Sequence, residues 1–384
     1  MKEKILLISA FPPGNETAGQ NLTKNLIMRM ADKYEIDMIY FTFDNKPNLI
    51  SLRKNIMRAK EIKINKVLSA FYILIGLMFL INPIFSRRFS IKTCLLLRKM
   101  AKENNYKYII FNFSQVFLYS LFVGKSNSKK IFIIHDVIAQ LFSRRKGVIN
   151  KILYILAIFN EKILFSLNKS NYYFAISEKD RNILYSNYGI DSKVFHVYLE
   201  SEIMSLKLNR IKIDNMIVLY GAWNRPENMQ TLKFFFRHVY PKIVKNNINL
   251  KVCVVGGGIS KSIYSQYISD ENVQIIGFVE NPYLYLARAK CLFAPLFGGA
   301  GVKVKVIESL ACGTPVLGTN ITFEGIEFKE GMILIKNSED AVEKILEITK
   351  IVDKNYKINL REKFLSYYAD EKYLLDKLID DLNG

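Results

Sequence analysis

The chain has 384 residues, half of them hydrophobic, and its four cysteines lie far apart at positions 94, 253, 291 and 312. This length suits two domains of ordinary size, and the cysteine spacing excludes a disulfide framework or a zinc site built on cysteine pairs. The net charge of +20 is uneven, because residues 1–210 hold 33 Lys and Arg against 15 Asp and Glu, whereas residues 211–384 hold 22 against 20. A basic first half indicates an anionic partner, nucleic acid or anionic lipid, unless the lysines only solvate the surface.

The first half alternates short apolar runs with helical patterns such as Leu22–Met30. Its beginning resembles the core of a signal peptide, but the apolar run is short and is followed by prolines rather than a cleavage site. We therefore expect a strand there. Near-continuous apolar strands indicate a parallel sheet that is covered on both faces. The expected strands are Ile5–Ser9, Ile36–Tyr40, Tyr108–Asn112, Ile131–Ile134, Tyr172–Ile176 and Lys193–Tyr198.

An uncharged run of fifteen residues, Val67–Ile81, lies within this basic half and is stopped by Asn82-Pro83. It is short of the roughly 20 residues that span a bilayer. Lys and Arg flank it on both sides, which is typical of an interfacial helix whose cations meet anionic headgroups. The sequence thus predicts an anionic membrane surface as partner of residues 53–99, with a buried core helix as the alternative. The flanking cations are Arg53, Lys54, Arg58, Lys60, Lys63, Lys66, Arg87, Arg88, Lys92, Arg98 and Lys99.

The second half repeats the strand and helix alternation, with helices expected at Asn228–Lys245 and Lys303–Cys312. The α/β class follows, with two Rossmann-like domains in series. We expect domains at 1–210 and 211–365, and a C-terminal helical segment, 366–384, that packs back on the first domain. The expected strands are Met216–Tyr220, Leu250–Val255, Val273–Ile276, Cys291–Ala294, Pro315–Leu317 and Met332–Ile335.

The segment from Ala294 to Thr319 carries the strongest chemical signal. A strand ends near Ala294, a loop containing Gly298, Gly299 and Gly301 follows, and a helix begins near Lys303. Backbone N–H groups of such a loop approach an anion closely, and the helix N-terminus carries partial positive charge. The segment therefore predicts a phosphate site at the carboxyl end of a strand, where open α/β sheets bind ligands.

Lys305 and Glu308 are three residues apart on this helix, so they share a face. A lysine near the loop can meet a diphosphate, while the carboxylate one turn later accepts hydrogen bonds from ribose hydroxyl groups. Lys303 points elsewhere, either toward the ligand from the loop or into solvent. A solvated Lys/Glu pair is the alternative. The glycine loop before the helix and the Gly313-Thr-Pro sequence that ends it argue against this alternative.

The run "PLFGGAGVKVKVIESLACGTPVLGTNITFEGI" resembles the nucleotide-sugar segment of the family 4 retaining glycosyltransferases of the GT-B fold (group 1 type). The resemblance extends through "LYGAWNRPENMQTLKFFFRHVYPKI", "LKVCVVGGG" and "VQIIGFVENPYLYLARAKCLFAP" in the second half. In the first half it is thinner and rests on "ISAFPPGNETAGQNLTKNL", "IHDV" and "FAISEKDRNIL". It implies two domains facing across a cleft, with the nucleotide sugar bound to the second.

The resemblance also implies roles for single residues. Glu308 would bind the donor ribose, and Lys305 would neutralise the departing diphosphate. Gly19 would let the N-terminal loop approach the donor phosphate or the acceptor. His135 would contact the donor sugar, with a histidine hydrogen-bonded inside its own domain as the alternative. The expected catalytic residues are His135, Lys305 and Glu308, and the expected donor-binding residues are Gly19, Gly221, Arg225, Gly299, Gly301, Lys303, Lys305 and Glu308.

The sequence departs from the family pattern at two positions. Many members carry a first Glu eight residues before the second, where this chain has Ala300. Many also carry an Arg just after the first glycine of the second domain, where this chain has Ala222; Arg225 is a candidate substitute. These changes leave the identity of the sugar open.

The expected function is retaining sugar transfer, without metal or cofactor, from a nucleotide sugar, with a UDP-sugar expected. The acceptor is expected to be a lipid-linked saccharide in surface polysaccharide assembly. The chain is expected to be cytoplasmic and peripheral at the inner face of the plasma membrane. A nucleotide-sugar epimerase and a non-catalytic sugar- or lipid-binding subunit are the alternatives. Nucleic acid is not expected as a partner, because no RNA or DNA motif accompanies the charge.

Overall fold

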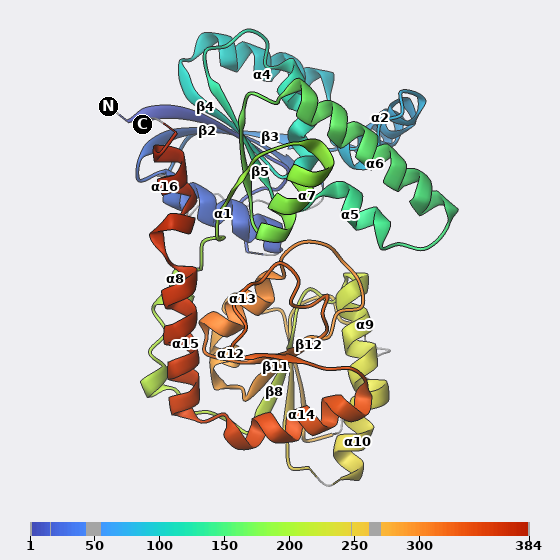
Figure 1. The fold of residues 1–384 in the computed structure, drawn as a ribbon, viewed down its shortest axis with the longest axis vertical. Coiled ribbons are helices and arrows are strands. Elements are labelled where there is room, and N and C mark those ends of the chain that lie inside the picture. Colours follow the sequence, from blue (N-terminus) through green and yellow to red (C-terminus); the bar gives the residue numbers. More distant parts are fainter. Residues whose placement is uncertain (1, 16, 44–54, 247, 261–269, 383–384) are drawn as a thin grey trace. The chain divides into compact units, whose positions relative to one another are not determined.

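The computed structural model describes residues 2–15, 17–43, 55–246, 248–260 and 270–382. The chain divides into two compact units, one formed by Met1–Tyr198 with Glu371–Gly384 and the other by Leu199–Asp370. Each unit has one parallel sheet with helices packed on its faces (Figure 1). The predicted α/β class with two Rossmann-like sheets is confirmed.

The sheet of the first unit has seven strands in the order β3-β2-β1-β4-β5-β6-β7. All neighbouring pairs are parallel, and β1 and β4 align so that Ser9 lies opposite Asn112. The residues that follow these strands therefore gather at one edge. The strands are β1 (Glu3–Ser9), β2 (Tyr34–Thr42), β3 (Ile56–Lys63), β4 (Tyr106–Asn112), β5 (Lys129–Ile134), β6 (Tyr172–Ala175) and β7 (Lys193–Val194).

Strand β3 is the one strand that the sequence analysis missed in this sheet. Its sequence, IMRAKEIK, lacks an apolar run, and most of its residues are exposed. A charged edge strand of this kind resists pairing with other chains. Its place at the sheet edge explains why the pattern of a buried parallel strand is absent.

The helices of the first unit cover the sheet and begin at side-chain caps such as Thr17, Ser90 and Ser177. The helices are α1 (Ala18–Met30), α2 (Lys66–Met78), α3 (Pro83–Ser86), α4 (Ile91–Glu103), the 3-10 helix η2 (Ser114–Phe122), α5 (Ile138–Ser143), α6 (Val148–Leu167) and α7 (Glu178–Tyr188). Buried side chains of α3, α4, η2, α5, α6 and α7 join residues of the strands in one hydrophobic core.

The end of the chain returns to the first unit as a 3-10 turn, Glu371–Tyr373, and helix α16 (Leu375–Asp380). Leu375 and Ile379 are fully buried there. Asp376 accepts a hydrogen bond from the Tyr198 hydroxyl at 2.8 Å and forms an ion pair with Lys33 at 3.2 Å. These contacts make α16 an integral part of the first unit.

The sheet of the second unit has six parallel strands in the order β10-β9-β8-β11-β12-β13. Trp223, Phe235 and Ile345 are among the side chains at the centre of its core. The strands are β8 (Met216–Tyr220), β9 (Lys251–Val255), β10 (Val273–Gly277), β11 (Cys291–Phe293), β12 (Val316–Gly318) and β13 (Met332–Leu334). The main helices are α8 (Ser201–Met204), η3 (Leu208–Arg210), α9 (Pro226–Phe234), α10 (Tyr240–Lys245), α12 (Tyr283–Arg288), α13 (Val304–Ala311), α14 (Ser338–Ile351) and α15 (Lys354–Tyr368).

Two details of the second unit differ from the sequence analysis. The helix expected at Asn228–Lys245 contains a π-helical turn, Phe235–Val239, just before Pro241, which has no amide hydrogen to donate. The first residues after Tyr198 group with the second unit rather than the first. The guanidinium of Arg361 explains this grouping, because it donates to the carbonyl oxygens of Ile203 and Met204 at 2.7 and 3.2 Å.

Candidate functional site

The glycine loop of the second unit leads directly into helix α13. Gly299 and Gly301 have φ values of 104° and 67°, a conformation that favours glycine. Lys303 occupies the N-cap position, and its Nζ donates to the carbonyl oxygen of Ala300 at 3.0 Å and to that of Gly301. The side chain of Lys303 thus turns back onto the loop and holds its shape.

Lys305 lies on the first turn of α13 and is partly buried. Its ammonium donates to the Asn228 side-chain oxygen at 2.7 Å and to the Tyr220 carbonyl at 3.4 Å. Burial, followed by the charges of Lys303 and Arg225, lowers the pKa of Lys305 to about 7. Its partners are neutral oxygen atoms, so an incoming diphosphate would supply the strong counter-charge.

Glu308 is 5% exposed, one turn after Lys305. It accepts a hydrogen bond from the Tyr283 hydroxyl at 3.3 Å. Burial, followed by the charge of Glu200, raises the pKa of Glu308 to about 7, while the hydroxyl groups of Tyr283 and Tyr220 oppose the shift. A carboxylate with such hydroxyl neighbours can accept hydrogen bonds from a diol.

The loops after β8 and β9 pack against each other through glycines. A side chain at Gly221 would meet the Asn228 amide at 2.9 Å, and one at Gly256 would meet the Gly221 carbonyl at 1.9 Å. The indole of Trp223 donates to the Val255 carbonyl at 3.1 Å and anchors the same corner. Gly221 therefore makes room for Asn228, which in turn holds Lys305.

Arg225 is the N-cap residue of α9 and is exposed. It lies near enough to act on the charge of Lys305, as Lys303 does. The structure thus brings Gly221, Arg225, Lys303, Lys305 and Glu308 together with the glycine loop at one edge of the second sheet. Within the described ranges, no group of three or more His, Cys, Asp and Glu side chains is placed to hold a metal ion.

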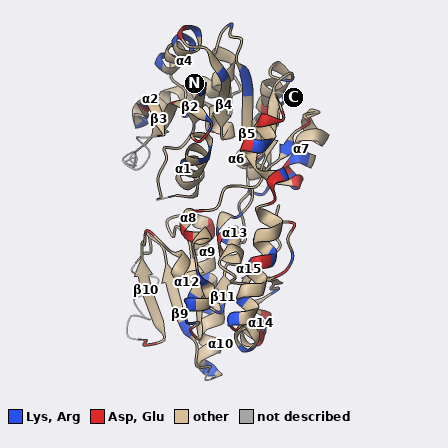
Figure 2. Ribbon diagram, turned by 90° about the vertical axis from the view of Figure 1, so that its left-hand side faces the viewer, with Lys and Arg blue, Asp and Glu red and all other residues tan. Residues whose placement is uncertain are grey.

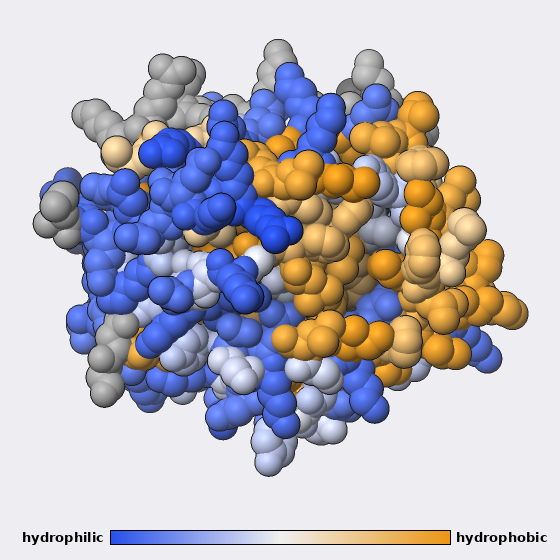
Figure 3. All heavy atoms as spheres, turned by 90° about the horizontal axis from the view of Figure 1, so that it is seen from above, coloured by the Kyte–Doolittle hydropathy of each residue, from blue (hydrophilic) through white to orange (hydrophobic). Residues whose placement is uncertain are grey.

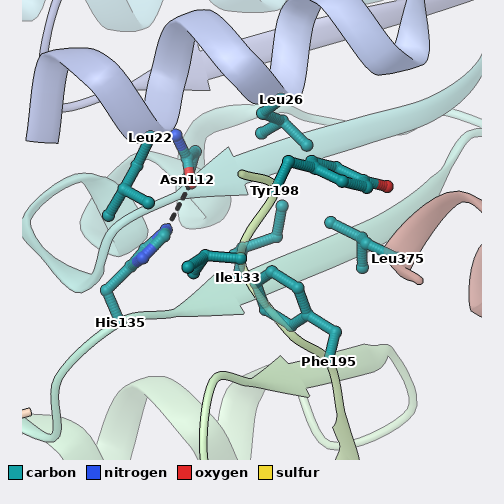
Figure 4. Close-up of a pocket in the computed structure, with 9 residues that line it drawn as sticks. Leu22, Leu26, Asn112, Ile133, His135, Phe195, Tyr198 and Leu375 are labelled. Carbon is teal, nitrogen blue, oxygen red and sulfur yellow. Dashed lines mark hydrogen bonds between the residues drawn. The ribbon is translucent and has the colours of Figure 1, made fainter. Parts of the chain in front are cut away.

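His135 follows β5 in the first unit and is 7% exposed (Figure 4). Its Nε2 lies 2.8 Å from the Asn112 side-chain oxygen. The amide nitrogen of Asn112 donates to the hydroxyl groups of Ser9 and Thr23 at 3.1 and 3.4 Å, which leaves its oxygen as the acceptor. His135 therefore carries its proton on Nε2, and burial lowers its pKa to about 3.

The Nδ1 atom of His135 has no hydrogen-bond partner in the part of the chain that the structure describes. It is the lone-pair nitrogen of a neutral imidazole, so it can accept a hydrogen bond from a ligand hydroxyl group. The small pocket beside His135 is lined mainly by apolar side chains of the first unit, among them Leu22, Phe195 and Leu375 of α16 (Figure 4).

Gly19 lies at the beginning of α1 and is buried. A side chain there would meet the Phe11 ring at 2.9 Å, so the packing of Phe11 requires a glycine. Gly19 and His135 belong to the first unit, and the other predicted site residues belong to the second. Their roles toward a ligand stay predictions.

The sequence analysis missed several polar side chains of these two edges. Asn228 supports Lys305, Tyr283 bonds to Glu308, and Asn112 sets the tautomer of His135. Asn112 and Tyr220 are the last residues of buried strands. A polar side chain at the end of an apolar strand can be recognised in the sequence as a candidate site residue. Asn228 and Tyr283 come from helices whose faces the sequence alone does not fix.

An apolar surface covers one side of the first unit, on the side of α2 and α6 (Figure 3). Helix α2 buries only Ser69 and Gly76, and most of its bulky residues are exposed. A core helix would do the reverse, so the expected buried alternative for this segment is wrong. The exposed residues are Val67, Leu68, Phe71, Leu74, Leu77, Met78, Phe79 and Leu80 from α2 and the turn after it, and Val148, Ile149, Ile152, Ile155, Phe159, Ile163 and Leu167 from α6. This set is called the apolar platform below.

Two buried asparagines join the halves of the apolar platform. The Asn160 side chain on α6 accepts from the Asn82 backbone N–H at 2.6 Å and donates to the Leu80 carbonyl at 2.9 Å. The Asn82 side chain donates to the Leu153 carbonyl at 2.8 Å. The two apolar faces are therefore held together as one surface. The α6 half was not expected from the sequence.

The cations of the first unit are not confined to this region, because Lys and Arg also lie on α4 and α7 (Figure 2). Lys60 and Lys63 of β3 are exposed, whereas Arg88 is buried, so Arg88 is not part of an outer basic rim. Arg53 and Lys54 lie outside the described residues. Among the helices that the structure describes, none has the length and apolar character needed to cross a membrane.

The comparisons with known proteins agree with this architecture. Residues 214–350 match the family model described as "Glycosyl transferases group 1". A Klebsiella pneumoniae protein described as an uncharacterized 44.6 kDa protein in the cps region is 25% identical over 262 residues, which cover 63% of this chain and 65% of that protein. The chain thus matches a little under two thirds of the length of this curated relative.

Two solved structures share the fold over nearly the whole of both chains. One is HepE of Anabaena in complex with UDP and glucose, with a TM-score of 0.67, 12% identity and coverage of 100% of each chain. The other is WaaG, a glycosyltransferase involved in lipopolysaccharide biosynthesis, with a TM-score of 0.66, 12% identity and coverage of 99% and 100%. The structure has the GT-B fold of these proteins, and its second unit carries the match to the group 1 glycosyltransferase model.

Proposed function

We propose that this protein transfers a sugar from a nucleotide sugar, with a UDP-sugar as the expected donor, to a lipid-linked saccharide. The observation that carries the proposal is the pairing of Lys305 and Glu308 at the glycine loop. Lys305 is bonded to neutral oxygens, and Glu308 lies among hydroxyl groups. The UDP that accompanies HepE supports the choice of donor.

In the proposed reaction, the bond between the anomeric carbon and the diphosphate oxygen breaks, and an acceptor hydroxyl group forms the new glycosidic bond. The acceptor proton leaves with the nucleoside diphosphate or to solvent. Lys305, Lys303, Arg225 and the N-terminus of α13 stabilise the negative charge of the leaving group. We propose that these cations act without a metal ion, which predicts full activity in the presence of EDTA.

His135 contributes as a neutral hydrogen-bond acceptor in this proposal. With a pKa of about 3, it holds no proton to release on Nδ1 near neutral pH. It would accept a hydrogen bond from a hydroxyl group of the transferred sugar and so fix the position of the ring. We further propose retention of the anomeric configuration, which NMR of the product linkage tests directly.

We propose that the apolar platform docks on an anionic bilayer at the inner face of the plasma membrane. Contiguous apolar surface of this kind marks an interaction site. Exposed cations border it, including Lys60 and Lys63 near α2 and Lys151 and Lys162 on α6. This combination fits acidic lipid headgroups around an inserted apolar face. The cps-region relative and WaaG support surface glycan assembly as the setting.

The test is a thermal-shift screen of the full chain against UDP, GDP, CMP and ADP, without metal. One nucleotide should raise Tm, and Lys305→Ala should abolish the rise. Lys350→Ala, an exposed lysine on α14, is the matched control and should keep it. An equal shift in Lys305→Ala would contradict the proposed donor site. Donor binding without sugar transfer to any lipid-linked acceptor would instead favour the non-catalytic alternative, and interconversion of free nucleotide sugars would favour the epimerase.

A further inference from the structure

A row of aromatic rings crosses the carboxyl edge of the first sheet. Strands β2, β1, β4 and β5 are neighbours in that order, and each is followed within two residues by a ring: Phe43, Phe11, Phe113 and His135. The ring centroids of Phe11 and Phe113 are 4.8 Å apart, and those of Phe113 and His135 are 3.9 Å apart. The row therefore runs from His135, the predicted contact of the donor sugar, to Phe43 at the other end of the edge.

Arg88 bridges the first two rings of this row. Its guanidinium carbon lies 5.1 Å from the Phe43 centroid and 5.2 Å from the Phe11 centroid. The guanidinium of Arg87 lies 4.6 Å from the same Phe43 ring. Two arginines thus share one aromatic ring, and such stacking leaves their N–H edges available for an anion.

The charge of Arg88 has no counter-charge in the described residues. The side chain is 7% exposed, and its Nε makes no hydrogen bond there. Burial, followed by the neighbouring charge of Arg87, lowers the pKa of Arg88 to about 9, and no described carboxylate contributes. A buried cation without a paired anion is costly to the folded state. A ligand that supplies a negative charge at this position would remove that cost.

The backbone of the arginine pair is fixed from two sides. The hydroxyl group of Ser69 on α2 donates to the Arg87 carbonyl at 2.8 Å, and the hydroxyl group of Tyr119 donates to the Arg88 carbonyl at 2.7 Å. The pair is therefore held in place before any ligand arrives. Ser69 also ties the pair to the helix whose outer residues form half of the apolar platform.

Two more features of this edge are typical of a binding site. Neither amide atom of Gln20, which is 1% exposed, has a hydrogen-bond partner among the described residues. Phe113 has a φ of 75°, a conformation that is strained for a bulky residue and that clusters at functional sites. Gln20 follows Gly19, which packs on the Phe11 ring that Arg88 contacts.

We infer that Arg88 and Arg87 bind the phosphate or diphosphate that links the acceptor saccharide to its lipid. This inference rests on the proposed function, since it takes a lipid-linked acceptor as given. Guanidinium groups bind phosphate through two parallel hydrogen bonds. A phosphate at this pair would lie next to α2, whose apolar outer face suits the lipid. The partly exposed rings of Phe11 and Phe43 would then pack against the first sugar.

The test is calorimetric titration of the full chain, saturated with UDP, with farnesyl diphosphate, farnesol and inorganic phosphate. Farnesyl diphosphate should bind more tightly than the other two probes. Arg88→Gln should weaken its binding about tenfold or more, because charge-assisted hydrogen bonds are lost. Arg181→Gln, at an exposed arginine on α7, is the matched control and should bind normally. Unchanged affinity in Arg88→Gln would overturn the inference.

Three comparisons separate the sources of phosphate and the two proposals. Inorganic phosphate binding as tightly as farnesyl diphosphate would indicate a free-anion site and overturn the inference. Arg88→Gln could instead lose binding to phosphatidylglycerol vesicles while keeping normal affinity for farnesyl diphosphate. That result would assign the arginine pair to lipid headgroups and would also overturn the inference. The variant Lys305→Ala lacks the proposed donor site. If its affinity for farnesyl diphosphate still depends on Arg88, the inference is supported even when UDP does not bind.

Stability provides a test that does not depend on the ligand. Arg88→Met removes the buried charge and keeps a side chain that can pack between the rings. We expect the Tm of this variant to be unchanged or raised, because a binding residue is retained at the expense of stability. A clear fall in Tm, with UDP binding intact, would identify Arg88 as a structural residue and contradict the inference.

Discussion

The two units share one architecture but place their charge differently. Both have a parallel sheet whose first strand lies inside, with the order β3-β2-β1-β4 in one and β10-β9-β8-β11 in the other. The first unit holds 33 Lys and Arg against 17 Asp and Glu, and the second holds 22 against 18. At the carboxyl edge, the first unit presents aromatic rings with an arginine pair, and the second presents a lysine and a glutamate among tyrosines.

We propose that this difference adapts one scaffold to two ligands. Lys305 and Glu308 are both shifted toward a pKa of about 7, which suits a ligand that carries both charge and hydroxyl groups. Arg88 stays a cation near neutral pH despite its burial, which suits a permanent anion beside apolar groups. In this proposal, the residues after the strands, rather than the sheets, decide what each unit binds. The predictions below test this division.

The largest effect is expected from Glu308→Ala. We propose that this buried carboxylate accepts hydrogen bonds from the ribose hydroxyl groups. Its loss should therefore lower kcat/KM for the donor roughly a hundredfold, with the KM for the acceptor unchanged. Steady-state kinetics with each substrate varied in turn measures this split. If the KM for the acceptor rose instead, that result would contradict the assignment of the donor to the second unit.

A smaller effect is expected at the apolar platform. Leu74→Glu together with Ile155→Glu places one charge in each half, and both residues are more than 60% exposed. Each change removes an apolar contact of about 1.5–3 kcal/mol, so sedimentation with phosphatidylglycerol vesicles should fall at least tenfold. UDP binding should be normal. Unchanged vesicle binding would show that the platform serves another partner.

The pH dependence of donor affinity should form a bell with its maximum near pH 7. Lys305, whose pKa is lowered to about 7, must be protonated to meet the diphosphate, so affinity falls as the pH rises above that value. Glu308, whose pKa is raised to about 7, must be ionised, so affinity also falls below it. Each limb should approach tenfold per pH unit. In Glu308→Gln the acid limb should disappear, and its persistence would assign that limb to another group.

The smallest effect is expected from Leu80→Gly. Leu80 has a φ of 57°, a conformation that glycine adopts without cost and that follows the end of α2. Its side chain is 56% exposed, so little packing is lost. The substitution should raise stability by up to about 1 kcal/mol, which is roughly 2–4 °C in Tm for a unit of this size. Vesicle binding should weaken slightly, and a drop in Tm would show that Leu80 packs in the folded protein.

Local sequence was enough to predict the glycine loop of the second unit, but not Asn228 and Tyr283 beside it, and it did not predict the ring row of the first unit. The donor loop lies within about a dozen consecutive residues, so glycine spacing and the Lys305–Glu308 pair were visible in the sequence. The ring row draws Phe43, Phe11 and Phe113 from three strands, and their proximity depends on strand order. Arg88 illustrates the limit, because its neighbour Arg87 is exposed and only the fold distinguishes the two.

The contribution of α16 to the first unit has a consequence for biosynthesis. The chain completes its second unit before it supplies Leu375, Asp376 and Ile379, which are needed to finish the first. During translation, the surface around Tyr198 and Lys33 stays uncovered until residues 375–379 have been added. The first unit, although it begins the chain, is therefore the later of the two to reach its final form.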